Sequence, residues 1–232
     1  MGLVADNLAE VNEKIETAAK RAGRDPKEIT LVAVSKTKPV ELIEEAIEAG
    51  QLDFGENYAQ ELRDKMKAIT DERVRWHFIG HLQKNKAKYV AGKTYEIHSI
   101  DRADLAEEID KRAEKEGQIQ RVMLEVNVGE EDTKAGTTED DAIELAKSLM
   151  KLDNIELVGL MTMPPYFDDM EEVRPYYRKL RALRDNMREK LEDEHALPEL
   201  SMGLSHDFEV AIEEGATRIR VGTAIFGERE RR

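Results

Sequence analysis

The sequence predicts a single (β/α)8 barrel, an α/β fold in which parallel strands alternate with helices. Three observations favour it. Short β-branched runs alternate with charged amphipathic stretches along the whole chain. There are eight such runs in 232 residues, about 29 residues per unit, close to the spacing in barrels of roughly 250 residues. No Gly/Ser-rich or Pro-rich linker divides the chain, so we expect one domain over residues 1–232. A doubly wound open sheet is the alternative that this pattern leaves open.

The expected elements follow in chain order. An opening helix is predicted at about residues 3–22 and ends at Gly23, since glycine readily takes the left-handed conformation that closes a helix. Strands are expected at 30–34, 52–54, 74–79, 95–100, 122–128, 155–161, 199–202 and 218–221. Helical patterns lie between them at 40–49, 101–116, 138–152, 170–194 and 205–214. Barrel proteins carry their functional groups at the carboxyl ends of the strands, so those ends are the positions to inspect.

Composition excludes several classes of function. Asp and Glu number 50 against 36 Lys and Arg, and the net charge of −14 argues against a surface that neutralises nucleic-acid phosphates. The chain has no cysteine, which excludes disulfides, thiolate metal sites and a cysteine nucleophile. The first twenty residues lack the pattern of a signal peptide, and no apolar run approaches the roughly 18 to 20 residues that span a bilayer. We therefore expect a cytoplasmic protein that binds neither nucleic acid nor membrane.

Lys36 is the sharpest local feature. It follows LVAVS at 31–35, a run typical of a strand buried on both faces. Burial disfavours the ammonium form of a lysine and favours the neutral amine, which attacks an aldehyde to form a Schiff base. The other interpretation is a strand-end lysine that reaches solvent or pairs with a neighbour. Lys38 is a possible substitute or a second cation in the pocket, although Pro39 argues against a continued strand.

Two strand-to-helix junctions near the C-terminus resemble anion sites. In the first, Ser205 or Asp207 can cap the helix that follows and leave free N–H groups at the mouth of the barrel. In the second, Gly222 and Thr223 follow the last strand and open a further helical turn, which Gly227 ends. Ordinary helix capping is the alternative explanation for both junctions.

The last strand, RIRV, carries Arg218 and Arg220 on the face opposite its apolar residues, so we expect one of them to face the barrel interior. A buried arginine needs an acceptor, either a carboxylate or a ligand atom. His77 and His81 are four residues apart, but Gly80 and the strand pattern argue against a helical zinc pair, and we expect no metal site. No phosphate-binding P-loop, dinucleotide GxGxxG or hydrolase GxSxG motif occurs.

Eight ordered motifs together resemble those of the pyridoxal phosphate homeostasis proteins, an alanine racemase N-terminal-like family also called proline synthetase co-transcribed. The resemblance spans nearly the whole chain. It rests on LVAVSKTKP at 31–39, DFGENYAQEL at 53–62, WHFIGHLQKNK at 76–86, HSID at 98–101, LEVNVGEEDTKAG at 124–136, GLMTMPP at 159–165, LSMGLSHDFEVAI at 200–212 and RVGTAIFGER at 220–229. One departure is Leu204, where the family often has methionine, and it concerns packing only.

The resemblance implies a fold-type III barrel that holds pyridoxal 5'-phosphate (PLP) as a Schiff base on Lys36. It also implies that Ser205 and the amides of Gly222 and Thr223 cradle the phosphate, and that Arg220 faces the pyridine nitrogen. The pocket-lining positions that it implies are Asn57, Ser201 and Met202.

An arginine at the ring nitrogen donates a hydrogen bond without giving up its proton, which weakens the ring as an electron sink. Racemases of this fold type take a second base from an additional β-domain and a partner subunit, and we expect no such domain in a chain that ends at Arg232. We therefore expect a monomeric PLP carrier that acts in vitamin B6 homeostasis without turnover, with apo PLP-dependent enzymes as possible recipients. The alternative is a weak PLP-dependent amino-acid racemase that uses Lys36 as one base and Tyr58 or Tyr166 as the other.

Overall fold

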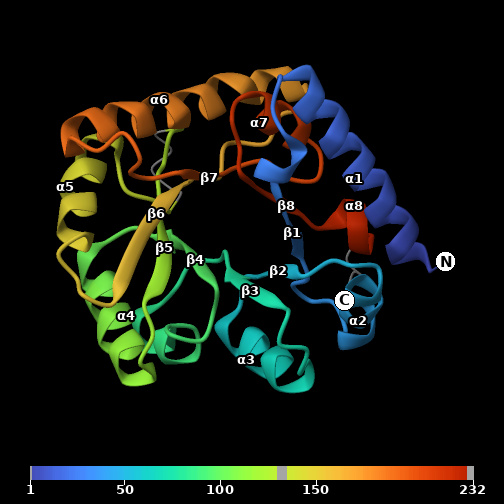
Figure 1. Ribbon diagram of the computed structural model, residues 1–232, viewed down its shortest axis with the longest axis horizontal. Coiled ribbons are helices and arrows are strands. Elements are labelled where there is room, and N and C mark those ends of the chain that lie inside the picture. The colour runs from blue at the N-terminus through green and yellow to red at the C-terminus, as the bar shows by residue number, and fades with distance from the viewer. Residues whose placement is uncertain (1, 130–134, 229–232) are drawn as a thin grey trace.

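Eight parallel strands close into a barrel in the order β1 to β8, and β8 pairs back to β1 (Figure 1). The computed structural model describes residues 2–129 and 135–228. The strands are β1 (Thr30–Val34), β2 (Asp53–Glu56), β3 (Arg75–Phe78), β4 (Glu96–Ile100), β5 (Gln120–Glu125), β6 (Ile155–Met161), β7 (Glu199–Ser201) and β8 (Arg218–Val221). Closure confirms the predicted barrel and excludes the doubly wound open sheet, in which the edge strands stay unpaired.

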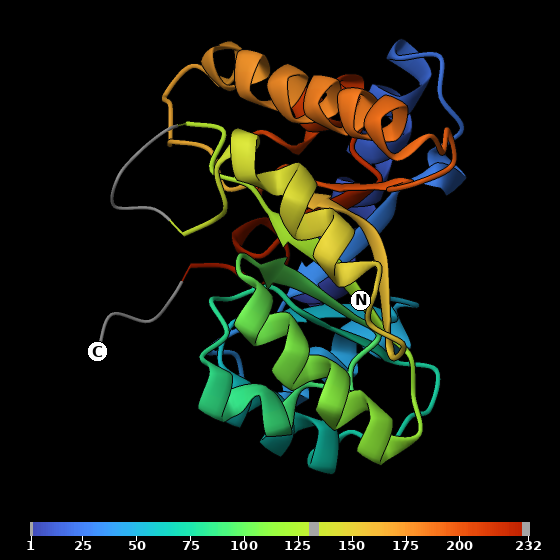
Figure 2. The ribbon, with the colours of Figure 1, turned by 90° about the vertical axis from the view of Figure 1, so that its left-hand side faces the viewer.

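Helices surround the barrel (Figures 1 and 2). The α-helices are α1 (Leu3–Arg21), α2 (Val40–Glu48), α3 (Ala59–Ala68), α4 (Ala103–Glu116), α5 (Glu139–Leu149), α6 (Arg174–Leu191), α7 (Phe208–Glu213) and α8 (Thr223–Phe226). Short 3-10 helices are η1 (Pro26–Glu28), η2 (Lys84–Tyr89) and η3 (Met170–Val173). Helix α1 packs against α2, α7 and α8, and Gly23 follows it with a φ of 67°, as its predicted end requires. Within the described ranges, no helix combines the length and apolar character needed to cross a bilayer.

The predicted strands at 30–34, 155–161 and 218–221 match the structure residue for residue, whereas α3 and η2 were not predicted. The strand expected at 122–128 ends at Glu125, and beyond it Val126 forms only an isolated bridge with Thr137. The helix expected from residue 205 begins at Phe208. Its start is delayed because Asp207 Oδ1 accepts from the Leu204 amide at 2.6 Å and holds a turn before the helix. Residues 130–134 and 229 of the quoted motifs lie outside the described residues.

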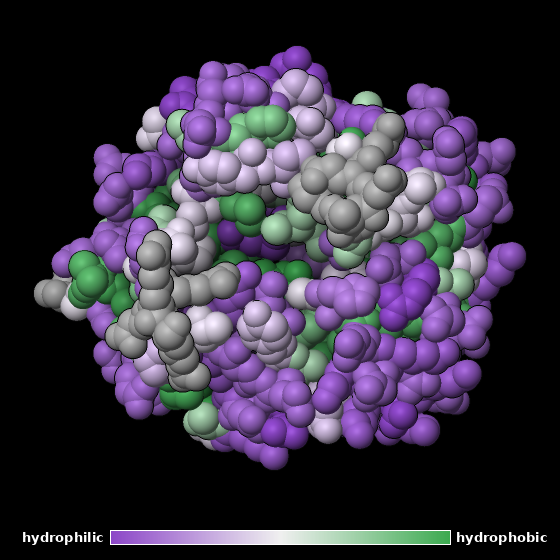
Figure 3. Space-filling model, turned by 180° about the vertical axis from the view of Figure 1, so that it is seen from behind, coloured by the Kyte–Doolittle hydropathy of each residue, from purple (hydrophilic) through white to green (hydrophobic). Residues whose placement is uncertain are grey.

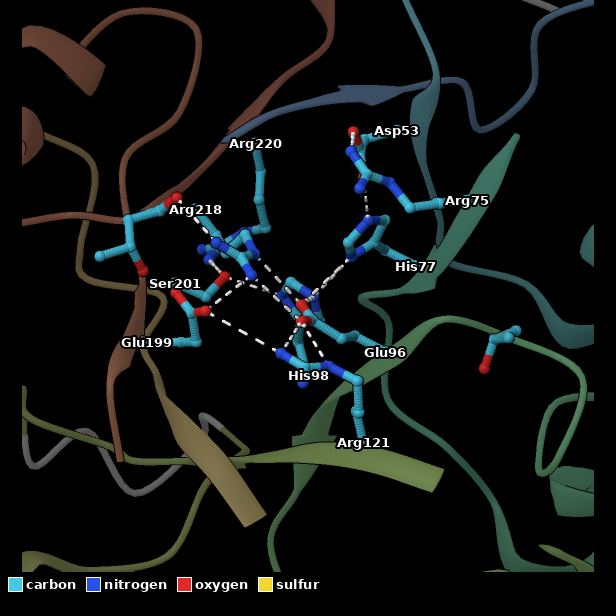
Figure 4. A network of polar contacts seen from close by, with 12 residues as sticks. Asp53, Arg75, His77, Glu96, His98, Arg121, Glu199, Ser201, Arg218 and Arg220 are labelled. Carbon is cyan, nitrogen blue, oxygen red and sulfur yellow. Dashed lines mark hydrogen bonds and ion pairs between the residues drawn. The ribbon is translucent and has the colours of Figure 1, made fainter. Parts of the chain in front are cut away.

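The apolar core lies between the strands and the helices. Outward-facing residues of β1 and β8, such as Leu31, Ala33, Ile219 and Val221, belong to it. The interior of the barrel is instead largely polar, because inward positions on β2, β3, β4, β7 and β8 carry charged or hydrogen-bonding side chains (Figure 4). Barrel interiors are usually filled by branched apolar side chains. The polar interior of this barrel therefore differs from the usual one and indicates a functional role for these side chains.

Candidate functional site

Lys36 lies in the turn that follows β1, at the carboxyl end of the barrel strands. The Ser35 amide still donates to Gly55 O at 3.0 Å, whereas the Lys38 amide turns back to Ser35 O at 3.0 Å. Thr37 between them has a φ of 63°, an unusual value for a β-branched residue. The backbone therefore reverses directly after Lys36. Figure 3 looks onto this face of the molecule and shows a hollow at its centre.

Lys38 does not extend the strand as a second amine beside Lys36. Its Nζ donates to three carbonyl oxygens at the end of α8, those of Phe226, Gly227 and Glu228, at 2.9, 3.0 and 2.9 Å. A cation at the C-terminal end of a helix satisfies carbonyl groups that have no partner within the helix. The structure thus assigns Lys38 a local role at α8 and disfavours it as a substitute for Lys36.

The two predicted anion junctions meet in space. Ser205 Oγ accepts from the amides of Gly222 at 3.0 Å and Ala224 at 3.5 Å, so the loop after β7 touches the first turn of α8. A Cβ atom on Gly222 would lie 3.3 Å from both Cβ and O of Val34, which shows how closely this backbone approaches the end of β1. The N-cap of α7 is Asp207, one of the two residues expected there, but its side chain makes no cap hydrogen bond. Ser205, Gly222 and Thr223 nevertheless lie together beside the end of β1, the strand that precedes Lys36.

Both arginines of β8 face the interior, where only one had been expected, but their partners differ. Arg218 forms ion pairs with Glu96 at 3.2 Å and Glu199 at 2.8 Å. Arg220 is 2% exposed and donates to neutral acceptors, Ser201 Oγ at 2.6 Å and Thr162 O at 2.8 Å. No carboxylate in the described part of the chain lies within ion-pair distance of Arg220. Its position near the mouth of the barrel, without a counter-ion, suits a guanidinium that donates to a ligand.

A hydrogen-bonded chain runs from Arg220 down through the interior (Figure 4). Ser201 Oγ is 2.8 Å from Nδ1 of His98, and Nε2 of His98 is 3.1 Å from Nδ1 of His77. His77 Nε2 in turn lies 2.9 Å from Asp53 Oδ1. The chain links the arginine at the mouth of the barrel to the carboxylate that begins β2.

The two buried histidines have opposite tendencies to ionise. Burial opposes a charge on His77, but its hydrogen bonds with Asp53 and Glu96 outweigh that effect and raise its pKa. Burial lowers the pKa of His98 to about 4, and the positive charges of His77 and Arg220 contribute. His98 is therefore neutral at ordinary pH, with one ring nitrogen as donor and the other as acceptor.

His77, Glu96 and His98 place ligand atoms within 4.8 Å of one another, as a metal site would require. The same Glu96 accepts from Arg121 at 3.0 Å and from Arg218 at 3.2 Å. Two guanidinium groups on one carboxylate compete with a cation for it. The histidine that had been paired with His77 in sequence, His81, lies elsewhere, with its Nδ1 3.8 Å from Asp101.

The three other expected pocket positions, Asn57, Ser201 and Met202, lie at or directly after the ends of β2 and β7. Asn57 follows β2, and its Oδ1 is a buried atom for which the described structure contains no hydrogen-bond partner. Ser201 is fully buried between Arg220 and His98. Met202 is fully buried within the main apolar core, which leaves its side chain no polar role.

Glu125, the last residue of β5, was missed from the sequence. It is 7% exposed, and burial raises the pKa of its carboxyl to about 7, with the charge of Asp101 adding to the rise and that of Arg220 opposing it. Glu96 and His98 were also not linked to the site, although the alternation in EIHS at 96–99 puts both on one face of a strand. Their partners come from β7 and β8, on the other side of the barrel.

The tyrosines considered as a second base lie at the surface. Tyr58 is 55% exposed and Tyr166 is 72% exposed. The ring of Tyr166 stacks on His206, with ring centroids 4.6 Å apart. Neither residue gains support as a catalytic group from such exposed surroundings.

The sequence model of the family described as alanine racemase, N-terminal domain, matches residues 7–230. The chain is 51% identical over 225 residues to the pyridoxal phosphate homeostasis protein of Aquifex aeolicus, covering 97% of this chain and 98% of that protein. The structure of PipY from Synechococcus elongatus with PLP bound aligns with a TM-score of 0.83 at 34% identity, covering 97% of this chain and all of PipY.

An alanine racemase of Clostridium difficile shares the fold, with a TM-score of 0.71 at 18% identity, and this chain covers 58% of it. Fold and site therefore define a class of proteins, the (β/α)8 barrels with a lysine directly after the first strand. The chain belongs to the alanine racemase N-terminal domain family and, within it, to the pyridoxal phosphate homeostasis proteins.

Proposed function

We propose that this protein binds PLP as a Schiff base on Lys36 and acts in intracellular PLP homeostasis. The observation that carries the proposal is the likeness, over 97% of this chain, to a PipY structure with PLP bound. Lys36 lies in the turn after the first barrel strand, whose end approaches the junction that Ser205 forms with α8. When bound, PLP supplies an aldehyde that condenses with an amine, forming a C=N bond and releasing water.

The residues present fit such a group. In the described residues, Asn57 Oδ1 has no hydrogen-bond partner and the Arg220 guanidinium has no carboxylate within ion-pair distance, and both features are typical of sites that bind a polar ligand. We propose that Ser205 and the amides of Gly222 and Thr223 bind the phosphate. Arg220 is proposed to donate to the ring nitrogen, and Asn57, Ser201 and Met202 to line the pocket.

The arrangement favours binding of the cofactor and disfavours PLP-dependent catalysis. Arg220 keeps its proton at any accessible pH, and Ser201 and Thr162 fix its orientation by hydrogen bonds. A guanidinium fixed in this way donates to the ring without protonating it, which limits the electron withdrawal that PLP-dependent carbanion chemistry needs. The Aquifex relative is named for homeostasis and not for a reaction.

Borohydride reduction followed by peptide mapping tests the attachment point. The expected result is a pyridoxyl adduct on Lys36, and loss of the visible absorbance in Lys36→Ala. Lys38→Ala is the matched control, because the Lys38 amine is bound to carbonyls of α8, and it should keep the adduct. Unchanged absorbance in Lys36→Ala, with the adduct on another lysine, contradicts the proposal.

The second candidate is a weak PLP-dependent racemase, with Lys36 as one base. It requires exchange of the α-proton of an amino acid with solvent. Incubation of the PLP-loaded protein with L-alanine in deuterium oxide should show no exchange above that of free PLP. Exchange at an enzymatic rate that is absent from Lys36→Ala would contradict the carrier proposal and support the racemase.

We further propose that the chain is one domain, acts as a monomer in the cytoplasm and passes PLP to apo PLP-dependent enzymes. Light scattering on the purified protein tests the oligomeric state, and the mass of a monomer is the expected result.

Mixing the PLP-loaded protein with an apo PLP-dependent enzyme tests delivery. The expected result is that the enzyme is activated faster than by free PLP at the same concentration. Activation no faster than free PLP argues against direct transfer.

A further inference from the structure

Three charged side chains hold the turn that carries Lys36, and we call them the turn clamp: Glu56, Glu61 and Lys65. Glu56 ends β2, whereas Glu61 and Lys65 lie on α3. Glu56 is fully buried and Lys65 is 5% exposed. Charged groups this deeply buried require close pairing, since desolvation is costly. Their convergence on one turn therefore needs a reason.

The clamp fixes the backbone on both sides of Lys36. On one side, Lys65 Nζ donates to Ser35 O at 2.7 Å, and Ser35 Oγ donates to Glu56 Oε1 at 2.7 Å. On the other, the Thr37 amide donates to Glu61 Oε1 at 2.6 Å. Lys65 joins the two carboxylates, at 2.6 Å from Glu56 and 2.7 Å from Glu61. None of these bonds uses the Lys36 side chain.

Thr37 shows why such a clamp is needed. Of the non-glycine residues with positive φ in the described ranges, it is the only β-branched one, at 63°. The left-handed region is sterically unfavourable for a β-branched residue and persists only where the surroundings hold it. The charge-assisted bond from the Thr37 amide to Glu61 supplies such a hold.

The clamp is not arranged for stability alone. Glu56 Oε2 is buried, and no hydrogen-bond partner for it occurs in the part of the chain that the structure describes. Burial raises the pKa of Glu56, and the charge of Lys65 only partly offsets this. A buried oxygen without a partner destabilises the fold. Its presence next to the Lys36 turn indicates that the clamp secures the position of the turn as well as stability.

We propose that the turn clamp is a positioning device that holds the backbone around Lys36 in its strained reversal, so that the amine faces PLP before the cofactor arrives. The inference rests on the proposed function. A turn that is already ordered avoids the loss of conformational entropy that would otherwise accompany binding.

Glu61→Ala tests the clamp without exposing a buried charge. The Glu61 side chain is 25% exposed, and its removal leaves Lys65 paired with Glu56. We expect the affinity for PLP, measured by absorbance titration, to fall about tenfold, the worth of one charge-assisted hydrogen bond. In the protein without PLP, hydrogen exchange of the Thr37 amide should become faster. Asp64→Ala, on the same helix and paired with Arg63 at the surface, is the matched control and should behave as wild type in both measurements.

Thr37→Gly separates positioning from a general structural role. Glycine takes a positive φ without steric cost, so adding Thr37→Gly to Glu61→Ala should restore part of the lost affinity. A purely structural role for Glu61 predicts no such rescue. If wild-type protein binds PLP and Glu61→Ala binds it equally well, or if glycine gives no rescue, the clamp proposal is wrong. If wild-type protein binds no PLP, the proposed function itself fails.

Discussion

The two ends of the barrel interior differ in how completely their charged groups are paired. At the amino ends of the strands, Glu96 accepts from Arg121 and Arg218 and lies beside two histidines. At the carboxyl ends, Arg220 has neutral acceptors only, and Asn57 Oδ1 has no partner in the described structure. Buried groups are normally satisfied, so the difference separates an end that stabilises the barrel from an end that binds.

Glu96→Ala is the most severe way to test the paired end. The substitution leaves Arg218 buried with one carboxylate fewer, and Glu96 itself is fully buried. Breaking a buried pair in this way should lower the free energy of unfolding by about 4 kcal/mol, measured by urea denaturation. Glu156→Ala removes the exposed partner of Arg121 and should cost less than about 1 kcal/mol. Equal effects of the two substitutions would falsify the view that the amino end is the stabilising one.

Glu125→Gln tests the unpaired end through pH. Since the folded-state pKa of Glu125 is raised from 4.5 to about 7, its protonated carboxyl stabilises the fold fully below pH 4.5, and this contribution is lost as the pH rises through 7. The loss should amount to about 3 kcal/mol. Glutamine does not ionise, so the variant should lack this part of the pH dependence. Urea unfolding of both proteins at acid and alkaline pH measures it, and parallel pH profiles contradict the prediction.

Ser201→Ala cuts the chain that joins the two ends. It removes the 2.6 Å acceptor of Arg220 and the 2.8 Å partner of His98. We expect a loss of about 2 kcal/mol in the free energy of unfolding, together with weaker PLP binding, because Arg220 loses its orientation. Ser99→Ala, which removes one buried bond to Gly80 O, is the control and should affect stability alone. Unchanged PLP affinity in Ser201→Ala would show that Arg220 does not depend on the chain below it.

Lys38→Ala should have the smallest effect. It leaves three carbonyl groups at the end of α8 without their cation, which should reduce the free energy of unfolding by about 1 kcal/mol. PLP binding should persist, because Lys38 is not proposed to form the Schiff base. Thermal unfolding and absorbance titration of the same sample check both points. Loss of the PLP absorbance in this variant would indicate that Lys38, and not Lys36, binds the cofactor.

The sequence pattern predicted those structural features that depend on residues adjacent in the chain. The alternation in RIRV correctly puts both arginines of β8 on one face, and the β-branched run before Lys36 correctly ends in a turn. The pattern did not predict which arginine is paired, because Glu96 and Glu199 reach Arg218 from other strands of the closed barrel. Helix α3 was missed, and with it the buried Lys65, whose burial follows from a contact with the β1 turn and not from a periodic apolar face.

The pairing of β8 with β1, which aligns Val32 with Arg220 and Ala33 with Val221, has a consequence for folding. Lys36 leaves the ribosome well before Ser205, Arg220 and Gly222, which lie about 170 to 190 residues later in the chain. Contacts between such distant segments form late, after the intervening chain has been ordered. An incomplete chain thus contains Lys36 without the rest of the proposed pocket. Stable binding of PLP would therefore indicate that the barrel has closed.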